Sequence, residues 1–346
     1  MKQIDFLAIG DIVIDAFIRL KEASVHCNVN RDDCELCMAF GDKIPFEFVE
    51  VVSAVGNGPN AAVSAARLGL NSAIMTDIGG DQNGKDCIET TKRNGVSTKY
   101  ISRHRGFKTN YHYVLWFEDE RTILVKHEDF PYRFMAPRKN PRWVYVTSLG
   151  ANSLNYQLEI GAWLEKNPDI KLAFQPGTFQ MNAGHEKLAA FYKRAEIFFC
   201  NVEEAKRILK MPAEEMSGSL EEVVKKLIAG MHALGPKIVV ITNGPKGAYA
   251  SDSSTSGTGG AGEVWFMPTY PDPKPPYERT GAGDAFASTF TAALVLGKSI
   301  PEAMKWAPIN SMSVVQEIGA QKGLLTQEKL LEYLKNAPAE YVPKKI

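Results

Sequence analysis

The stretch Arg279-Thr280-Gly281-Ala282-Gly283-Asp284-Ala285-Phe286 runs directly into the apolar segment ASTFTAALVLG (287–297). The glycines lie where a loop is expected to become a helix. Their backbone N–H groups can therefore converge at the helix N-terminus, where the helix dipole favours an anion such as a transferring phosphoryl group. The carboxylate of Asp284 can accept the proton of an attacking hydroxyl group there. The same pattern also fits a helix cap beside two permissive glycines.

Upstream of this stretch, expected strands and helices alternate. The expected strands are 4–14, 72–78, 143–147, 171–174, 197–200 and 237–242, and the expected helices are 58–69, 84–94, one ending near 166, 184–194 and 219–234. This order predicts an α/β fold with a doubly wound, mostly parallel sheet flanked by helices. The ligand of such a fold binds outside the carboxyl ends of the strands. The loop 174–178 is expected at one of these ends.

Three further segments alternate apolar and polar residues and do not fit the parallel sheet: 15–20, 46–52 and 107–127. They predict a small second sheet. A sheet that projects at the ligand-binding edge would act as a lid, formed by approximately 15–52 and 107–127 within a single domain that covers 1–346. The Gly/Ser-rich segment 251–262 is expected to be the loop of a late hairpin and not a domain boundary.

Composition excludes several classes of protein. The chain has 346 residues, 45% of them hydrophobic, which is ample for a large core. It has 40 basic and 40 acidic residues and no basic stripe, so we expect no nucleic-acid partner. No apolar stretch is long enough to span a bilayer, and acidic residues interrupt the N-terminal apolar run. We therefore expect a cytoplasmic protein that does not bind membranes.

These blocks resemble the PfkB family of carbohydrate kinases, which includes ribokinase, fructokinase and adenosine kinase. TGAGDAF (280–286) is similar to the C-terminal signature of that family. Other blocks are similar to family motifs and follow in the family's order: Gly10-Asp11 with Asp15, Gly56-Asn57-Gly58-Pro59-Asn60-Ala61-Ala62, Gly79-Gly80-Asp81 with Gly84, Glu120-Arg121-Thr122-Ile123, Asn201 with Glu204, and Thr242-Asn243-Gly244-Pro245-Lys246-Gly247. The resemblance covers about 4–325 and implies a ribokinase-like fold. Several weak motifs in one order are much more specific than any one of them.

The resemblance also implies roles for single residues. Asp284 would be the catalytic base, and the backbone of Gly281, Ala282 and Gly283 would form the anion hole. Substrate hydroxyl groups would be held by Asp15 and Asn60, with Gly56 and Asn57 of the N-terminal signature in the same site. From the residues alone, Asp15 could also be a strand-end cap and Asn60 a side chain at a helix N-terminus.

On the nucleotide side, the resemblance implies ATP and Mg²⁺. Asn201 and Glu204 match a pair that organises Mg²⁺, usually through water, which suits an ion that keeps several waters. The positions around the nucleotide phosphates and ribose are matched by Thr242, Gly244 and Gly247. Asn310 matches an adenine-side position. The sequence departs from the family at Glu278 and Arg279, where Asp-Thr is common, so activation by K⁺ is in doubt. Val55 replaces the first of two glycines in the N-terminal signature.

A cysteine cluster lies in an insertion after the first strand. Cys34 and Cys37 have the spacing of a zinc knuckle, and His26 and Cys27 could complete a tetrahedral structural Zn²⁺ site. The alternative is a set of free thiols packed under the lid. Cys87 and Cys200, by contrast, are expected in the core.

The function that follows is ATP-dependent phosphorylation of a hydroxymethyl group on a sugar. One alternative is a nucleoside kinase of the adenosine or inosine type, whose base could lie against Phe17, Phe107 or Trp116. Another is a catalytically silent family member that only binds its ligand. The lid aromatics could contact a ligand, or they could bury the interface of a homodimer; they are Tyr111, Tyr113, Trp116 and Phe117.

Overall fold

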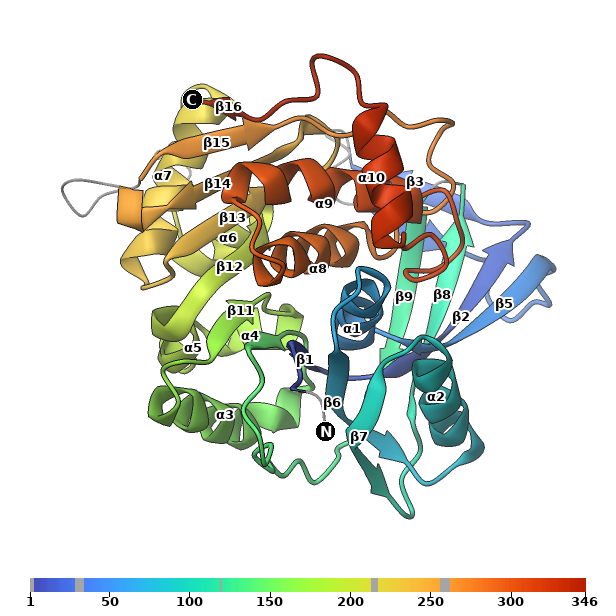
Figure 1. The fold of residues 1–346 in the computed structure, drawn as a ribbon. Helices are drawn as coiled ribbons and strands as arrows, with labels where there is room; N and C mark the ends of the chain where they lie inside the picture. The colour runs from blue at the N-terminus through green and yellow to red at the C-terminus, as the bar shows by residue number, and fades with distance from the viewer. Residues whose placement is uncertain (1–2, 29–33, 119, 213–216, 256–261) are drawn as a thin grey trace.

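The computed structural model describes residues 3–346 except 29–33, 119, 213–216 and 256–261. Its largest sheet has the strand order β16-β15-β14-β13-β12-β11-β10-β1-β6-β7 (Figure 1). Pairing is parallel from β7 to β13 and antiparallel from β13 to β16. The strands are β1 (Phe6–Ile9), β6 (Ser72–Gly79), β7 (Ser97–His104), β10 (Trp143–Val146), β11 (Lys171–Phe174), β12 (Ala195–Asn201), β13 (Ile238–Thr242), β14 (Ala248–Asp252), β15 (Val264–Met267) and β16 (Lys344–Lys345). The predicted mostly parallel α/β sheet is confirmed.

Helices cover both faces of this sheet. Successive residues of a strand point to opposite faces, so in β1 Phe6 and Ala8 join one core cluster while Leu7 and Ile9 join the other. The first cluster includes residues of α1 (Asn57–Arg67), α8 (Ala282–Val295), α9 (Ile300–Val314) and α10 (Gln327–Lys335). The second includes residues of α3 (Leu154–Lys166), α5 (Ala189–Arg194), α6 (Val202–Leu209) and α7 (Leu220–Ala233). Two further helices are α2 (Gln82–Arg93) and α4 (Thr178–Ala183).

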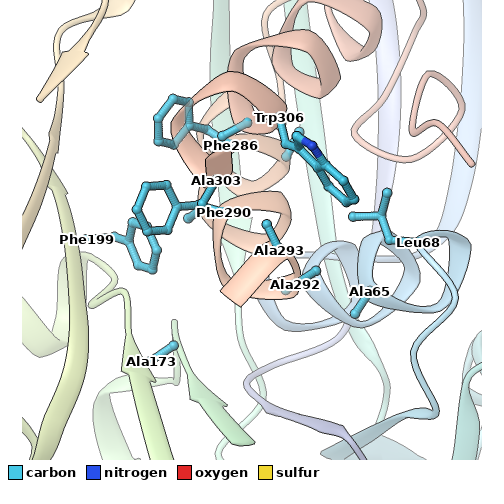
Figure 2. Close-up of a cluster of buried hydrophobic side chains, with 14 of the residues drawn as sticks. Ala65, Leu68, Ala173, Phe199, Phe286, Phe290, Ala292, Ala293, Ala303 and Trp306 are labelled. Carbon is cyan, nitrogen blue, oxygen red and sulfur yellow. The ribbon is translucent and has the colours of Figure 1, made fainter. Parts of the chain in front are cut away.

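The packing of α8 aligns its N-terminus with that of α1. Phe290 of α8 meets Phe199 of β12 edge to face, with ring centroids 5.7 Å apart (Figure 2). Ala65 of α1 and Ala292 of α8 are fully buried in the same cluster, and such small side chains let two helices approach closely. The hydroxyl groups of Ser64 and Thr289 meet at 3.4 Å between the helices.

A second, four-stranded sheet has the order β5-β2-β8-β9, as the alternating segments predict. Its strands are β2 (Val13–Leu20), β5 (Phe46–Val55), β8 (Asn110–Phe117) and β9 (Glu120–Lys126). In Figure 1 these strands lie to one side of the main sheet. The Gly/Ser-rich segment connects β14 to β15, which form the predicted late hairpin. Most of this loop lies outside the described residues.

The prediction of one strand over 4–14 is wrong, because the chain changes sheets within it. Strand β1 ends at Ile9, and β2 begins at Val13 in the second sheet. At the break Gly10 packs so closely that a Cβ there would lie 2.9 Å from Thr147 Cγ2 and 3.3 Å from Gly58 Cα. The apolar run hides this break because Ile12, between the two strands, is itself buried. The sequence pattern also gives no signal for strand β7, because none of its residues is buried.

The zinc prediction for the cysteine cluster is not supported. The insertion forms a hairpin of β3 (Ser24–Cys27) and β4 (Cys34–Cys37), and Cys27 is joined to Cys34 by a disulfide bond. Sulfur atoms in a disulfide bond are not thiolates and cannot serve as zinc ligands. His26 Nε2 lies 3.2 Å from Ser24 Oγ instead, and Cys37 is a free thiol. Among the described residues, no group of three or more His, Cys, Asp and Glu side chains could hold a metal ion.

None of the helices that the structure describes has both the length and the apolar character needed to cross a membrane.

Candidate active site

A cavity of about 550 Å³ lies between the two sheets. Asn201 at the end of β12, Thr242 at the end of β13 and Gln175 just after β11 mark its floor as the carboxyl edge of the main sheet. From the other side, strands β2, β8 and β9 contribute side chains. The sequence-predicted residues that line this cavity are Asp15, Gly56, Asn57, Asn60, Asn201, Glu204, Thr242, Gly281, Gly283 and Asp284.

A second cavity, of about 390 Å³, adjoins the first. The two share the lining residues Thr242, Arg279 and Gly283. Gly244, Gly247 and Ala282, which the sequence assigns to the nucleotide and the anion hole, line the second cavity. The two groups of predicted residues therefore lie in neighbouring cavities that meet at the N-terminus of α8.

The N-terminus of α8 is open where the cavities meet. Gly281 precedes the helix with a φ of 82°, and a Cβ there would lie 2.6 Å from Ala320 Cα, so only glycine fits. Gly283 lies in the first turn, and a Cβ there would meet no atom of the described residues within 4 Å. The first N–H groups of a helix lack intrahelical partners, so this turn can bind an anion in the shared space.

Asp284 is buried, with 9% of its surface exposed, and two amides hold its carboxylate. Asn57 Nδ2 donates to Oδ1 and Asn60 Nδ2 donates to Oδ2, each at 2.8 Å. Burial raises the pKa of Asp284, the hydrogen bonds from Asn60, Asn57 and Gln175 lower it in part, and the charge of Glu204 raises it. A carboxylate with a raised pKa is a better general base near neutral pH.

Side chains behind this constellation fix its orientation. Gln321 Nε2 donates to Asn60 Oδ1 at 3.0 Å and to the Ala54 carbonyl at 2.7 Å, which turns the Asn60 amide nitrogen toward Asp284. The Tyr145 hydroxyl donates to Gln175 Oε1, which leaves the Gln175 amide nitrogen for Asp284. The loop 174–178 is expected near the site from the sequence, but its pattern carries no signal for the contact of Gln175 with Asp284.

Asp15 lies in β2 with 7% of its surface exposed. Its Oδ1 lies 3.3 Å from His112 Nδ1 but makes no hydrogen bond with any described residue. A buried carboxylate oxygen in this state can accept a hydrogen bond from a ligand hydroxyl group, which would remove the cost of leaving it unpaired.

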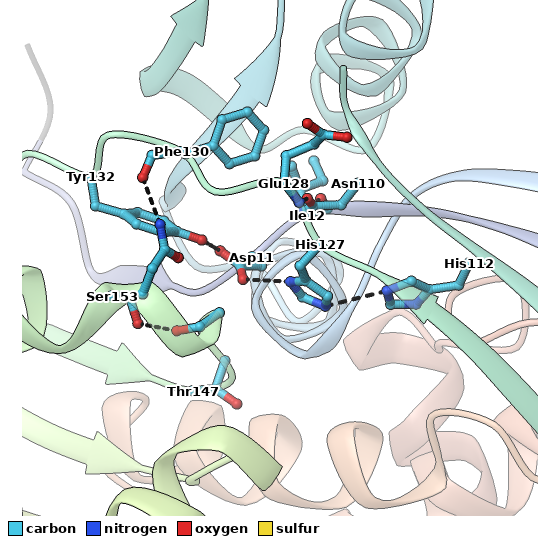
Figure 3. A network of polar contacts seen from close by, with 12 residues as sticks. Asp11, Ile12, Asn110, His112, His127, Glu128, Phe130, Tyr132, Thr147 and Ser153 are labelled. Carbon is cyan, nitrogen blue, oxygen red and sulfur yellow. Dashed lines mark hydrogen bonds and ion pairs between the residues drawn. The ribbon is translucent and has the colours of Figure 1, made fainter. Parts of the chain in front are cut away.

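A pair of histidines that the sequence does not predict lies on the same wall. His112 Nε2 lies 3.3 Å from His127 Nε2, and both residues line the cavity (Figure 3). His127 Nδ1 lies 3.1 Å from Asp11 Oδ2, and Tyr132 donates its hydroxyl proton to Asp11 Oδ1 at 2.8 Å. The lone histidines in the sequence carry no signal for this contact, because it depends on the pairing of β2, β8 and β9.

Asn201 and Glu204 form a capping box at the N-terminus of α6. Glu204 N donates to Asn201 Oδ1 at 2.8 Å, and Asn201 N donates to Glu204 Oε2 at 2.9 Å. Burial raises the pKa of Glu204, while its hydrogen bond from the Asn201 backbone lowers it. Each side-chain oxygen has a second lone pair, so the pair still fits an ion that binds through water.

Glu278 is used within the protein. Its Oε1 accepts a hydrogen bond from Thr280 N at 2.7 Å and one from the Thr280 hydroxyl group, and Arg121 Nη1 of β9 lies 3.7 Å away. With 2% of its surface exposed and a guanidinium beside it, this carboxylate gives no support to a K⁺ site. Arg121 was also missing from the predicted site residues, although the motif Glu120-Arg121-Thr122-Ile123 contains it.

Several predicted residues do not reach either cavity. Asn310 is fully buried, donates to Thr289 Oγ1 at 2.7 Å and accepts from Leu325 N at 2.9 Å, so within the described chain it links α9 to neighbouring segments. Phe17 and Trp116 are buried, and neither they nor Phe107 are among the described lining residues. The cavity has a different apolar wall, made of Ile123, Val125 and Phe179.

Known proteins are similar to this chain in sequence and in fold. The family model described as pfkB family carbohydrate kinase matches residues 49–327. The chain is 25% identical over 287 residues to a ribokinase of Haemophilus influenzae, covering 82% of this chain and 87% of that protein. It is 27% identical over 302 residues to a 5-dehydro-2-deoxygluconokinase of Bacillus licheniformis, covering 81% and 86%. In fold it is similar to Arabidopsis thaliana ribokinase complexed with ribose and ATP, with a TM-score of 0.77, 20% identity and coverage of 97% and 99%.

Proposed function

The chain belongs to the pfkB family of carbohydrate kinases and is an ATP-dependent kinase, and we propose that it phosphorylates a hydroxymethyl group of a sugar with Asp284 as the general base. The observation that carries this proposal is the setting of Asp284. Its carboxylate is held by Asn57 and Asn60 in one cavity, and its neighbour Gly283 lines both cavities. A base is therefore held next to a helix N-terminus that is open to an anion.

In this reaction Asp284 accepts the proton of the substrate hydroxyl group while the oxygen attacks the γ-phosphorus of ATP. The new bond joins that oxygen to phosphorus, the bond to the β-phosphate oxygen breaks, and ADP leaves. The N–H groups of the first turn of α8 stabilise the negative charge of the transferring group. Asp15, with an oxygen that makes no hydrogen bond to any described residue, orients a second hydroxyl group of the substrate.

The nucleotide occupies the second cavity in this proposal. Thr242, Gly244 and Gly247 line its polar end, while Pro308, Met312 and Val315 supply apolar contacts of the kind that a base requires. Arg279 lines both cavities and supplies positive charge where the phosphates pass. Asn201 and Glu204 would hold Mg²⁺ through water, and this ion would neutralise charge on the phosphates.

The second sheet acts as the lid of a single kinase domain in this proposal, excluding water while the phosphoryl group is transferred. We also propose that its outer face joins two copies of the chain. Val49 and Val51 of β5, Tyr113 of β8 and Leu124 of β9 are about half exposed there. Exposed apolar side chains on a sheet are a common feature of subunit interfaces.

The test is a measurement of ADP release with magnesium-ATP and a panel of sugars and nucleosides. The matched variants are Asp284→Asn and Asp169→Asn, the latter at an exposed position outside both cavities. We expect turnover of a sugar that falls by about 10²–10⁴-fold in Asp284→Asn and is unchanged in Asp169→Asn. Turnover that survives Asp284→Asn would contradict the role of this residue. Binding without ADP formation would instead indicate a catalytically silent protein.

A nucleoside is the second candidate substrate. The first cavity, which we call the acceptor cavity because the phosphoryl acceptor would bind there, has an apolar wall of Phe179, Ile123 and Val125. The Phe179 ring is 36% exposed and meets the His127 ring edge to face at 5.7 Å. A preference of the same panel for nucleosides, lost in Phe179→Ala, would select this candidate over a sugar.

A further inference from the structure

His112 and His127 connect two buried carboxylates across the wall of the acceptor cavity. His112 lies directly opposite Asp15 in the pairing of β8 with β2, and its Nδ1 is 3.3 Å from Asp15 Oδ1. His127 follows β9, and its Nδ1 is 3.1 Å from Asp11 Oδ2. The two Nε2 atoms are 3.3 Å apart. The side chains of His112 and His127 are only 14% and 16% exposed, so water screens these contacts weakly.

The contacts of His112 and His127 restrict which of their ring nitrogens can carry a proton. A ring nitrogen beside a carboxylate carries a proton, because two lone pairs would repel each other; both Nδ1 atoms are therefore N–H groups. With both rings neutral, two Nε2 lone pairs would face each other, and with both rings doubly protonated, two N–H groups would do so. A single proton between the Nε2 atoms satisfies the contact and gives the pair one positive charge.

We propose that His112 and His127 share one proton and act as positioning residues that hold the Asp15 side chain in place to bind a substrate hydroxyl group. The inference rests on the proposed function and adds two residues that determine how the acceptor is bound. The shared proton belongs on His127, because its Nδ1 makes a hydrogen bond to Asp11 Oδ2 at 3.1 Å, whereas Asp15 Oδ1 accepts none from His112. His112 then accepts at Nε2 and holds its Nδ1 3.3 Å from Asp15 Oδ1, a contact that leaves this oxygen without a hydrogen bond to any described residue.

The surroundings of the pair define its pH dependence. Besides Asp15, the titratable side chains that line the cavity with the pair are Arg121, Cys200, Glu204, Arg279 and Asp284, and Phe179 packs on His127. Asp11 contacts the pair from behind the wall. A second proton would place two N–H groups against each other and separate the rings. His112 would then leave Asp15, so the KM of the acceptor should rise as the pH falls. The kcat should fall separately where Asp284, whose pKa is raised, takes up its own proton.

The first experiment needs no substrate. The whole chain, labelled with ¹⁵N in its 6 histidines, is titrated by NMR, and His112→Asn and His127→Gln assign the signals. We expect one neutral ring protonated at Nδ1 and one doubly protonated ring, which change together as the pH falls. In His127→Gln, His112 should titrate independently. Two neutral rings that each titrate alone in the unaltered protein would overturn the shared proton.

The second experiment uses D-ribose as the acceptor probe and measures KM and kcat across the pH range. We expect His112→Ala to raise KM by about ten- to a hundredfold, and His112→Asn to recover much of this loss because the Asn amide nitrogen replaces Nδ1–H. His127→Gln should remove the rise in KM at low pH. The control is His185→Gln, since His185 pairs with Glu186 outside the cavity.

The outcomes separate this inference from the proposed function. A fall in kcat with unchanged KM in His112→Ala, or equal losses in His112→Ala and His112→Asn, would overturn the positioning role. If ribose is not phosphorylated, the calorimetric binding of ribose to the unaltered protein and to His112→Ala supplies the same comparison of affinity. If the two proteins bind ribose with equal affinity, or if neither binds it, the result counts against the inference. Turnover of any other sugar of the panel would still support the proposed function.

Discussion

At the scale of single residues, Asp284 combines two opposing requirements. Burial favours its protonated form and raises its pKa, while three amide side chains stabilise the carboxylate and limit that shift. A carboxyl group whose pKa is higher in the folded than in the unfolded state adds stability that is fully present below its unfolded pKa. That contribution is lost as the pH rises through the folded pKa, so the ionised base lowers the stability of the folded protein at neutral pH.

We therefore expect Asp284→Asn to be inactive and yet no less stable than the unaltered protein at neutral pH. Asparagine removes the buried charge and keeps the side-chain shape, although one of the three neighbouring amides loses an acceptor. The measurement is the Tm of both proteins across a pH series. The advantage of the variant should grow as the pH rises. A Tm difference that is independent of pH would mean that the pKa of Asp284 is not raised by burial.

Some residues of the candidate site have a local signal in the sequence, and others do not. The sequence grouped Asp284 with Asn57 and Asn60 because they lie in contiguous motifs at helix starts that resemble family signatures, and in the structure both asparagines contact Asp284. His112 and His127 could not, because their contact arises from the register of strands that are far apart in sequence. Asn310 was assigned by resemblance alone, and its side chain is used inside the core instead.

At the scale of elements, the two glycines at the start of α8 have different environments. Gly281 is required by the fold, whereas Gly283 faces the space proposed for the anion. Gly281 has a positive φ and contacts Ala320, whereas Gly283 is helical and faces open space. We expect Gly281→Ala to lower the Tm. Gly283→Ala should keep or raise it, since alanine favours a helix by about 0.5–1 kcal/mol over glycine.

The same pair should separate in activity. A methyl group at Gly283 projects into the space that both cavities share and would displace the phosphoryl group, so we expect kcat/KM to fall by at least about tenfold in a well-folded protein. ADP release measured beside the Tm of each variant gives both quantities. Full activity in Gly283→Ala would show that the first turn of α8 does not approach the transferring group.

Two capping boxes allow the Mg²⁺ proposal to be tested at matched positions. Glu204 in α6 and Glu222 in α7 each accept a hydrogen bond from the backbone N–H of their N-cap residue. Glutamine keeps this acceptor but removes the charge, so both substitutions should affect their helices alike. Only Glu204 lines the cavity. Glu204→Gln should raise the Mg²⁺ concentration needed for half-maximal activity by about tenfold or more, as the loss of an outer-shell group does, while Glu222→Gln should not. Equal curves for the two variants would remove Glu204 from the metal site.

The local sequence pattern predicted most helices and strands, but it did not predict the point at which the chain passes from one sheet to the other. Alternation and apolar runs located most strands of both sheets within a few residues, because burial on one or both faces imposes them, but they missed β7 and β16. The switch at Gly10 has no such signature, since Ile12 is buried on the way from β1 to β2. The spacing of Cys34 and Cys37 pointed to zinc, but the pairing of β3 with β4 puts Cys27 directly opposite Cys34. A two-residue spacing cannot reveal such a cross-strand neighbour.

At the scale of the whole molecule, the second sheet has two faces with different environments. Asp15, His112 and Val125 lie on one face and line the cavity. Because alternate residues of a strand point to opposite sides, their neighbours form a row across the other face. That row contains Val51, Ala16, Tyr113 and Leu124, which are successive cross-strand partners. Any contact that covers the outer face therefore adjoins the substrate site through the thickness of a single sheet.

The outer face supplies the last prediction, which concerns assembly. Leu124 is 52% exposed in this row, and a lysine there would place a charge in the proposed contact between two copies. We expect the unaltered protein to sediment as a dimer and Leu124→Lys as a monomer. The control is Leu331→Lys, at a 42% exposed position on α10, which should remain dimeric. Because the row backs the strands that carry Asp15 and His112, the monomeric variant should also bind its acceptor more weakly. A monomeric unaltered protein would exclude the dimer, and a dimer that survives Leu124→Lys would place its interface elsewhere on the molecule.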